Sequence, residues 1–379
     1  MPPPEGVKEP VHETPSVRRA LKPGVDRSRG ATMCSGACPT ERPSDHRMLE
    51  DNLSRWRPDR SGFYEIWYLK LNHLLTGAAL WVRYGIVAPR DGSVAPWGEL
   101  WGIFFDPDDP AANRAGLERF DVPAIRTGGE AIVRIGGASL GAGRATGRLV
   151  AGGTELEWDL RFAENPTTFH HVPGYLRALG ILPTQVCTPN VDLAVHGSFR
   201  VGGRSFELGG DPGQQGHIWG RRLGHRWTWA HCNSFAGAAG AVFEGITAQV
   251  RVGPFVSPPL TSMFFRLDGV DLTLNSPGFM VRTRSDHGLA FWRFVADHRD
   301  RRFVGELSAR LEDIVVVGYT DTDLSKVYCH NTKLGSMRLL VQERSGRSHE
   351  TRRALESHRC VALEYVDRTV HPSMRVSVP

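Results

Sequence analysis

The segment from Gly213 to Asn233 concentrates residue types that can move protons and stabilise positive charge. It holds three histidines and three tryptophans, and all six occupy odd-numbered positions: His217, Trp219, His225, Trp227, Trp229 and His231. Side chains alternate between the faces of an extended strand, so residues of equal parity share a face. Imidazole titrates near neutral pH, and indole faces attract cations. The pattern predicts an aromatic wall carrying titratable groups.

This arrangement depends on a turn between two strands. A hairpin at 220–224 would set His217 and Trp219 beside the odd-numbered residues of the next strand. Such a wall suits a pocket for an apolar or cationic substrate. The alternative is a sheet core in which tryptophan fills space and hydrogen bonds satisfy each histidine. Both interpretations stay open on the sequence.

Protonating an alkene requires an acid together with a surface that stabilises the resulting carbocation. The candidate catalytic residues on this basis are His217, Trp219, His231 and Glu244. Candidate ligand-binding residues in the same region are Gln215, Trp227, Trp229 and Asn233. A reaction that depends mainly on holding the substrate in a reactive conformation would need no strong acid. Gln215 or Asn233 could then polarise a carbonyl group of the substrate.

A second polar set interrupts otherwise apolar runs nearer the N-terminus: Lys70, Asn72, Arg83 and Glu99. Interior charges are costly unless they are paired, so we expect Arg83 or Lys70 to meet Glu99. A structural ion pair is one interpretation. The other is an anchor for a carboxylate or carbonyl group of a ligand, and the four residues are therefore candidates for ligand binding.

The elements that must position these residues are short strands. Aromatic and β-branched runs, beginning with 63–72, 78–87 and 99–105, recur about every ten residues and are separated by Gly, Pro and Asp. This spacing is typical of β-sandwiches and barrels. We predict an all-β protein with an N-terminal β domain at 48–185 and a C-terminal β-barrel domain at 186–379. Residues 1–47, rich in Pro, Arg, Glu and Ser, are predicted to be disordered, and translation starts at Met33 or Met48 stay open.

Composition excludes several classes of protein. The formal net charge is +5, but Arg and acidic residues are interspersed and no basic stripe is present, which argues against nucleic-acid binding. No histidines have zincin spacing, and the six cysteines form no pattern of ligand pairs, so no metal site is expected. No apolar run is long enough for a membrane span, and we predict a cytoplasmic protein.

Several short segments together resemble the AttH-like and hydroxyneurosporene synthase (carotenoid 1,2-hydratase) family. The most specific is Gly-x-Gln-x-His-x-Trp-Gly at 213–220, followed by Trp-x-Trp at 227–229. Weaker matches lie at 68–72, 80–84, 98–101, 157–160 and 328–331. His217 and Trp219 match the family's His-x-Trp pair. The family's downstream Tyr-x-Asp is replaced here by residues 242–245, in which Glu244 is the acid and no Tyr occurs.

The resemblance implies two lipocalin-like (calycin) domains and a cavity for an apolar small molecule. It also implies a hydratase, isomerase or cyclase that needs no organic cofactor and acts on an isoprenoid, polyene or polyketide. The absence of the Tyr-x-Asp motif argues against hydration specifically. It leaves acid-assisted isomerisation or cyclisation open. The alternative function is non-enzymatic binding or transport of a lipid, and either function allows transient membrane contact for uptake of the ligand.

Overall fold

Two large antiparallel sheets dominate the computed structural model, which describes residues 50–92, 94–164 and 167–379. The all-β fold class is confirmed. The predicted N-terminal segment 1–47 lies outside the described residues. No helix within the described ranges is long and apolar enough to cross a bilayer.

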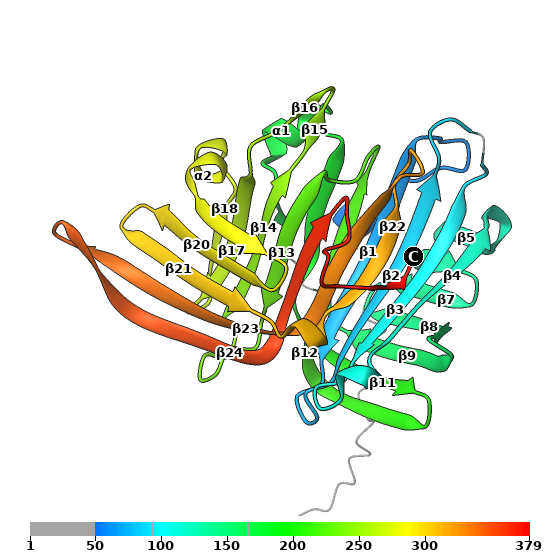
Figure 1. Cartoon of the computed structure of the whole chain (residues 1–379), viewed down its shortest axis with the longest axis horizontal. Coiled ribbons are helices and arrows are strands. Elements are labelled where there is room, and N and C mark those ends of the chain that lie inside the picture. Colours follow the sequence, from blue (N-terminus) through cyan, green and yellow to red (C-terminus); the bar gives the residue numbers. More distant parts are fainter. Residues whose placement is uncertain (1–49, 93, 165–166) are drawn as a thin grey trace, which may run out of the picture. The chain divides into compact units, whose positions relative to one another are not determined.

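The first sheet has twelve strands (Figure 1). In spatial order they are β4 (Arg114–Asp121), β3 (Trp97–Phe105), β2 (Ala79–Ala88), β1 (Phe63–Asn72), β12 (Arg204–Gly220), β11 (Thr184–Val201), β9 (Thr154–Phe162), β8 (Arg144–Ala151), β7 (Ala138–Gly141), β6 (Ala131–Ile135) and β5 (Ile125–Gly128), with β10 (Phe169–His170) paired to β11. Strands β11 and β12 are the longest of this sheet, with 18 and 17 residues.

The second sheet has eleven strands. They are β18 (Val270–Leu274), β17 (Leu260–Leu267), β14 (Val242–Gln249), β13 (Arg226–Cys232), β24 (Ser348–Asp367), β23 (Lys326–Ser345), β21 (Arg301–Ser308), β20 (Phe291–His298) and β19 (Arg284–Gly288), with β22 (Val315–Thr320) paired to β23 and to β25 (Val376–Val378). A separate small hairpin joins β15 (Arg251–Val252) to β16 (Phe255–Val256).

Helices are few and short. The α-helices are α1 (Gly174–Ala178) and α2 (Pro277–Arg282), and the 3-10 helices are η1 (Glu50–Asn52), η2 (Pro110–Ala112), η3 (Val122–Ala124) and η4 (Leu311–Asp313). Helix α1 has five residues. Prolines interrupt the chain on both sides of it, at 173 and 183, which limits its length.

The chain passes from the first sheet to the second between Gly220 and Arg226. This change of sheet does not coincide with the predicted boundary at 185/186, because β11 and β12 complete the first sheet by pairing with β9 and β1. The described chain belongs to a single compact unit, His46–Pro379. Whether its parts fold as separate domains stays a prediction.

Strand β1 shows how the two sheets are buried on both faces. Its odd-numbered residues Phe63, Trp67 and Leu69 enter a core enclosed by the first sheet. Its even-numbered residues, Tyr64 and Tyr68 among them, enter a different core that also contains side chains of the second sheet. A third core lies on the remaining face of the second sheet. An apolar run without clear alternation therefore encodes a strand between two cores.

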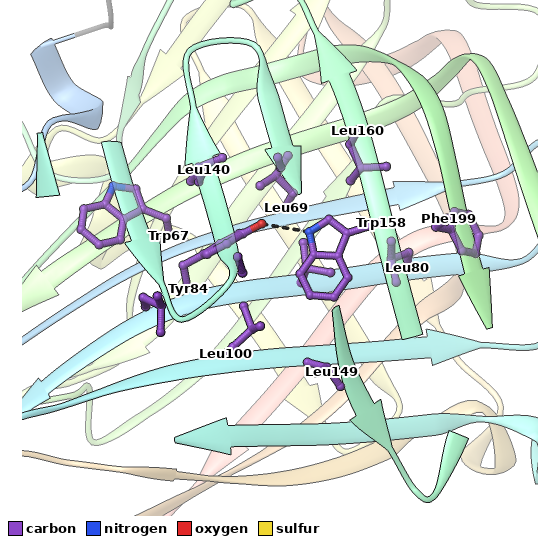
Figure 2. Packing of buried hydrophobic residues seen from close by; sticks show 14 of the residues in the cluster. Trp67, Leu69, Leu80, Tyr84, Leu100, Leu140, Leu149, Trp158, Leu160 and Phe199 are labelled. Carbon is purple, nitrogen blue, oxygen red and sulfur yellow. Dashed lines mark hydrogen bonds between the residues drawn. The ribbon is translucent and has the colours of Figure 1, made fainter. Parts of the chain in front are cut away.

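The first sheet curls until β4 packs over β8. The strands approach so closely that a Cβ at Gly116 would lie 2.5 Å from the carbonyl oxygen of Val150, and only glycine fits there. Figure 2 shows the enclosed core, where the Trp158 indole donates a hydrogen bond to the Tyr84 hydroxyl at 2.9 Å. This hydrogen bond satisfies two buried polar groups inside an apolar cluster.

Candidate functional site

A pocket of about 280 Å³ lies between the two sheets, and its wall is almost wholly apolar. The first sheet contributes Tyr64, Ile66, Tyr68, Trp81, Arg83 and Ile218. The second sheet contributes Trp227, Trp229, Ile246, Ala248, Leu260, Ser262, Tyr319 and Glu364. The segments around α1 and α2 add Val172, Leu176, Leu182, Pro277, Met280 and Val281.

The aromatic wall predicted from Trp227 and Trp229 is present. The two indoles are on the same face of β13, where they stand opposite Ala248 and Ile246 of β14, and all four residues line the pocket. The Trp229 ring meets that of Tyr68 edge-on at 5.7 Å, so one contact spans the two sheets. Residues of equal parity share this face, as the alternation predicted.

The predicted hairpin between the two halves of the His/Trp segment is not formed. Strand β12 pairs with β1 and β11, and β13 pairs with β14 and β24, so the two strands belong to different sheets. Ile218 lines the pocket, and Trp219 on the opposite face of β12 packs against the core of the first sheet. His217 shares the face of Trp219. The expected common wall of His217, Trp219 and the β13 residues is therefore wrong.

His217 fits the alternative interpretation, a core histidine satisfied by hydrogen bonds. The ring is fully buried, and its Nδ1 lies 2.7 Å from the Asp51 carbonyl oxygen and its Nε2 3.0 Å from Glu65 Oε1. It stacks on Trp67 with centroids 4.8 Å apart. The Glu65 carboxylate also accepts hydrogen bonds from the segment that follows η1. This His–Glu pair fastens that segment to the first sheet.

Gln215 shares this environment. Its side chain accepts a hydrogen bond from Asn190 Nδ2 at 2.6 Å and donates one to Asn52 Oδ1 at 3.1 Å. The amide is fully buried and does not line the pocket. The structure thus gives Gln215 partners within the protein on the face away from the cavity.

His231 lies close to the pocket without lining it. Its Nε2 is 2.7 Å from the Val191 carbonyl oxygen, and Nδ1 has no hydrogen-bond partner within the described chain. Burial, reinforced by the nearby Lys70 ammonium, holds the pKa of His231 well below its ordinary value. The ring is therefore neutral at physiological pH, which disfavours it as the acid.

Glu244 stands directly opposite His231 in the sheet and accepts three hydrogen bonds on one oxygen. The donors to Oε1 are Thr188 Oγ1 at 2.5 Å, Trp229 Nε1 at 3.1 Å and His171 Nε2 at 3.2 Å. The other oxygen, Oε2, is buried and has no partner among the described residues. Glu244 itself lies behind the wall, whereas His171 and Trp229 line the pocket.

His171 is the site residue that sequence reasoning missed. Its Nδ1 lies 2.9 Å from Ser262 Oγ, so Ser262, His171 and Glu244 form a continuous hydrogen-bonded row. With Glu244 ionised, Nε2 of a neutral His171 carries the proton and Nδ1 accepts from the serine hydroxyl. The sequence does show two adjacent histidines, His170 and His171, in an irregular, proline-rich stretch. No sequence periodicity indicates that His171 contacts a residue of β14.

Arg83 and Glu99 meet as predicted. Arg83 Nη2 lies 3.8 Å from Glu99 Oε2, and both side chains are almost fully buried. Glu99 also accepts hydrogen bonds from the Trp97 and Trp101 indoles and pairs with Arg119 at 3.5 Å. Arg83 lines the pocket, so the ion pair and the ligand-anchor interpretations apply to the same residue.

Lys70, Asn72 and Asn233 lie outside the pocket wall. Lys70 Nζ donates to Asn233 Oδ1 at 3.2 Å, and Asn72 Nδ2 donates to the backbone of Lys333 at 2.8 Å. Burial lowers the pKa of the Lys70 ammonium. These contacts join the two sheets, and of the two cations expected for Glu99 it is Arg83, not Lys70, that meets it.

Two further polar features border the pocket. The Tyr68 hydroxyl has a pKa well above its ordinary value, because it is buried and because the Glu244 and Glu364 carboxylates lie near it. It therefore stays protonated and can donate a hydrogen bond. Glu364 Oε1 accepts from Lys333 Nζ at 2.9 Å, an ion pair beneath Trp81 and Trp229.

Metal-binding geometry is not found in the described ranges, where no group of three or more His, Cys, Asp or Glu side chains could hold an ion. The four cysteines described, at 187, 232, 329 and 360, are free thiols, as expected for buried cysteines.

No protein-family model matches the chain. A protein of Mycobacterium tuberculosis, Rv0493c in strain H37Rv and MT0513 in strain CDC 1551, is 30% identical over 303 residues, which cover 78% of this chain and 87% of the relative. The chain belongs to the family of these mycobacterial proteins. Both are described as uncharacterized, so the relationship brings no activity with it.

Among solved structures, a putative AttH protein of Nitrosomonas europaea has a TM-score of 0.52 at 10% identity, covering 81% of this chain and 93% of that one. This likeness concerns the fold alone and supports the AttH-like architecture. Kievitone hydratase from Nectria haematococca aligns with a TM-score of 0.45 at 11% identity over 79% of this chain and 88% of its own. CghA aligns with a TM-score of 0.44 at 12% identity over 84% and 95%.

Proposed function

We propose that the protein binds an apolar small molecule between its two sheets and converts it by proton transfer, without an organic cofactor. The observation that carries this proposal is the His171–Glu244 pair, 3.2 Å apart and almost fully buried, bordering an otherwise apolar pocket. A charged or polar pair is costly to bury unless it is hydrogen-bonded, so a buried His–Glu pair beside an apolar pocket is a candidate for function. The reaction classes that fit are hydration, isomerisation and cyclisation.

The pair is suited to acid catalysis when it holds one proton beyond that of the neutral imidazole, which makes it neutral overall. The proton resides on His171 with Glu244 ionised, or on Glu244 with His171 neutral. Both ring nitrogens of His171 are hydrogen-bonded, so the pocket-lining Ser262 hydroxyl would give its proton to a double bond or a carbonyl oxygen and take one from His171 Nδ1. Glu244 acts through His171, as a positioning residue. This role replaces the direct one expected for Glu244, and His217 and Trp219 have no part in it.

Cation stabilisation would come from the aromatic wall. The indole faces of Trp227 and Trp229 border the pocket, and Tyr68 meets Trp229 edge-on. Indole faces stabilise positive charge without attacking it, which is what a protonated polyene or isoprenoid needs. Hydration of the hydroxyneurosporene synthase kind, isomerisation and cyclisation share this first step and differ in what quenches the cation.

A second candidate function, transport of an apolar ligand, is favoured by the mouth of the pocket. Side chains exposed by 60% or more lie on three segments that contribute to the pocket wall or adjoin it: Tyr175, Leu179, Ile181, Phe255 and Val281. Neighbouring residues of α1 and α2 line the pocket itself. An apolar rim of this kind supports transient contact with a lipid surface, from which either a carrier or an enzyme would take its ligand.

Deuterium incorporation separates the two functions. The ligand that remains bound during purification is identified by native mass spectrometry, then returned to the protein in D₂O. An enzyme that protonates its substrate produces a product carrying solvent deuterium. His171→Gln and Glu244→Gln should lower the rate of incorporation by about 100-fold or more, the usual effect of removing a positioned proton donor, with little change in affinity.

The matched control is His217→Gln, since His217 is also a fully buried histidine paired with a glutamate but belongs to the first sheet and does not line the pocket. Incorporation per folded molecule should equal that of the unaltered protein. A ligand returned without deuterium, or full activity in both pocket variants, would rule out proton transfer by this pair, and the carrier function would then be the better account.

A further inference from the structure

We infer that Arg83 anchors an acidic group of the ligand, so that the pocket takes an amphipathic carboxylic acid and not a neutral hydrocarbon or alcohol. The inference rests on the proposed binding function of the same pocket and adds the chemical class of the ligand. Arg83 is 2% exposed and lines the cavity, where its guanidinium lies 4.2 Å from the centroid of the Tyr319 ring.

The hydrogen-bonding capacity of Arg83 is largely unused. Its Nε and Nη1 atoms are buried without a partner in the described part of the chain, and Nη2 lies 3.8 Å from Glu99, beyond hydrogen-bond distance. Leaving a buried charged donor unsatisfied is costly. By contrast, Arg266 on the surface makes two hydrogen bonds to one carboxylate, that of Asp271.

Glu99 does not compensate Arg83 fully, because its oxygens are already in use. Trp97 and Trp101 donate to them at 2.9 and 3.0 Å, and Arg119 approaches at 3.5 Å from a half-exposed position. Two guanidinium groups therefore share one carboxylate, which leaves a net positive charge at this part of the pocket. Water screens Arg119, whereas Arg83 is enclosed by aromatic rings.

A carboxylate is the ligand group that matches this environment. It carries the missing negative charge, accepts several hydrogen bonds and suits the planar guanidinium. Apart from His171, Thr184, Ser262 and Glu364, the remaining wall is apolar and aromatic, so most of the ligand must be apolar. A diphosphate is a poorer match, since the described wall of the pocket contains no second cation beside Arg83.

Binding of two retinoids tests the inference. All-trans-retinoic acid and all-trans-retinol share one apolar polyene and differ in the charged group, and each is titrated against the intrinsic tryptophan fluorescence at pH 8. Since a hydrogen bond to a charged group contributes about 1.5–3 kcal/mol, the unaltered protein should bind the acid about 10- to 100-fold more tightly. Methyl retinoate should behave like retinol.

Arg83→Met should abolish the preference by weakening the acid alone, and Arg83→Lys should keep part of it. Arg144→Met, which removes an exposed arginine paired with Asp159 and away from the pocket wall, is the control and should leave the preference intact. Equal affinities for acid and alcohol in the unaltered protein overturn the anchor even if Arg83→Met fails to fold. Failure of both retinoids to bind instead overturns the apolar pocket and the inference with it. Unchanged activity of the His171 and Glu244 variants would contradict only the proton-transfer proposal and would leave the Arg83 anchor standing.

Discussion

The protein contains two buried His–Glu pairs, one within the first sheet's core and one beside the pocket. They show how strongly position decides the role of a residue. His217 and Glu65 are enclosed by the first core and by the segment after η1, whereas His171 and Glu244 border the pocket. The residue types and distances are nearly the same. The pairs differ in the sheet that carries the glutamate and in their position relative to the pocket, and this position decides the access of a ligand to the imidazole.

His231 offers a residue-level prediction about stability and pH. Its pKa lies well below its ordinary value in the folded protein, whereas in the unfolded chain it is about 6.5. Below that pH the unfolded chain takes up a proton that the folded protein does not bind. Acidification from pH 6.5 therefore destabilises the fold, by up to about 1.4 kcal/mol per pH unit for this group.

The measurement is the free energy of unfolding in urea between pH 5 and pH 8, for the unaltered protein and for His231→Gln. The variant should show the shallower pH dependence below pH 6.5, by about one proton. His170, His225, His287 and His330 have pKa values lowered mainly by burial, so part of the acid sensitivity should remain. Identical slopes in the two proteins would show that His231 does not contribute.

The sequence predicted the positions of individual strands better than their pairing. The run 63–72 coincides with β1, and the parity of Trp227 and Trp229 gave the face that lines the pocket. Parity cannot report which strands pair, because pairing between β12 and β1 joins residues about 150 positions apart. The sequence therefore suggested a local hairpin where the chain changes sheets, and it gave no link between His171 and Glu244, which lie 73 positions apart.

Closure of the first sheet provides a prediction at the level of its strands. Gly116→Ala places a Cβ 2.5 Å from the Val150 carbonyl oxygen and 2.8 Å from Ala151 Cα, so β4 must move away from β8. We expect a loss of about 1–3 kcal/mol in unfolding free energy, the usual effect of overpacking. Gly203→Ala is the control, because a Cβ there meets no atom within 4 Å; it should change stability by less than about 0.5 kcal/mol. Equal effects would mean that β4 tolerates displacement.

At the scale of the whole described unit, the three cores explain why the pocket lies where it does. Each sheet encloses its own aromatic core, and those cores are filled by large side chains such as Trp158 and Trp292. The space between the sheets holds the remaining core, in which Tyr68 meets Trp229, and the pocket borders these side chains. An open cavity is sustained there because the strands that border it are already fixed by the cores behind them.

The rim of this cavity supports contact with anionic lipid. Figure 1 shows α1, α2 and the β15–β16 hairpin at the same edge of the molecule. Exposed Arg251, Arg282 and Arg284 lie on these segments or next to them, with Asp286 as the nearby acid. Apolar side chains flanked by arginine are suited to the interface of a negatively charged membrane. The same surface gives an apolar ligand a path that avoids water.

Vesicle binding tests this arrangement. The protein should co-sediment with vesicles containing phosphatidylglycerol more than with vesicles of phosphatidylcholine alone, and high salt should weaken the difference. Replacing Tyr175, Leu179 and Phe255 together with Ser should reduce binding several-fold, because each loses its apolar contact with the lipid. Leu75→Ser, at a comparably exposed position in the β1–β2 turn, should have no effect. If the triple variant binds as well as the unaltered protein, or the control loses as much, the rim is not the docking surface and the ligand must reach the pocket through solution.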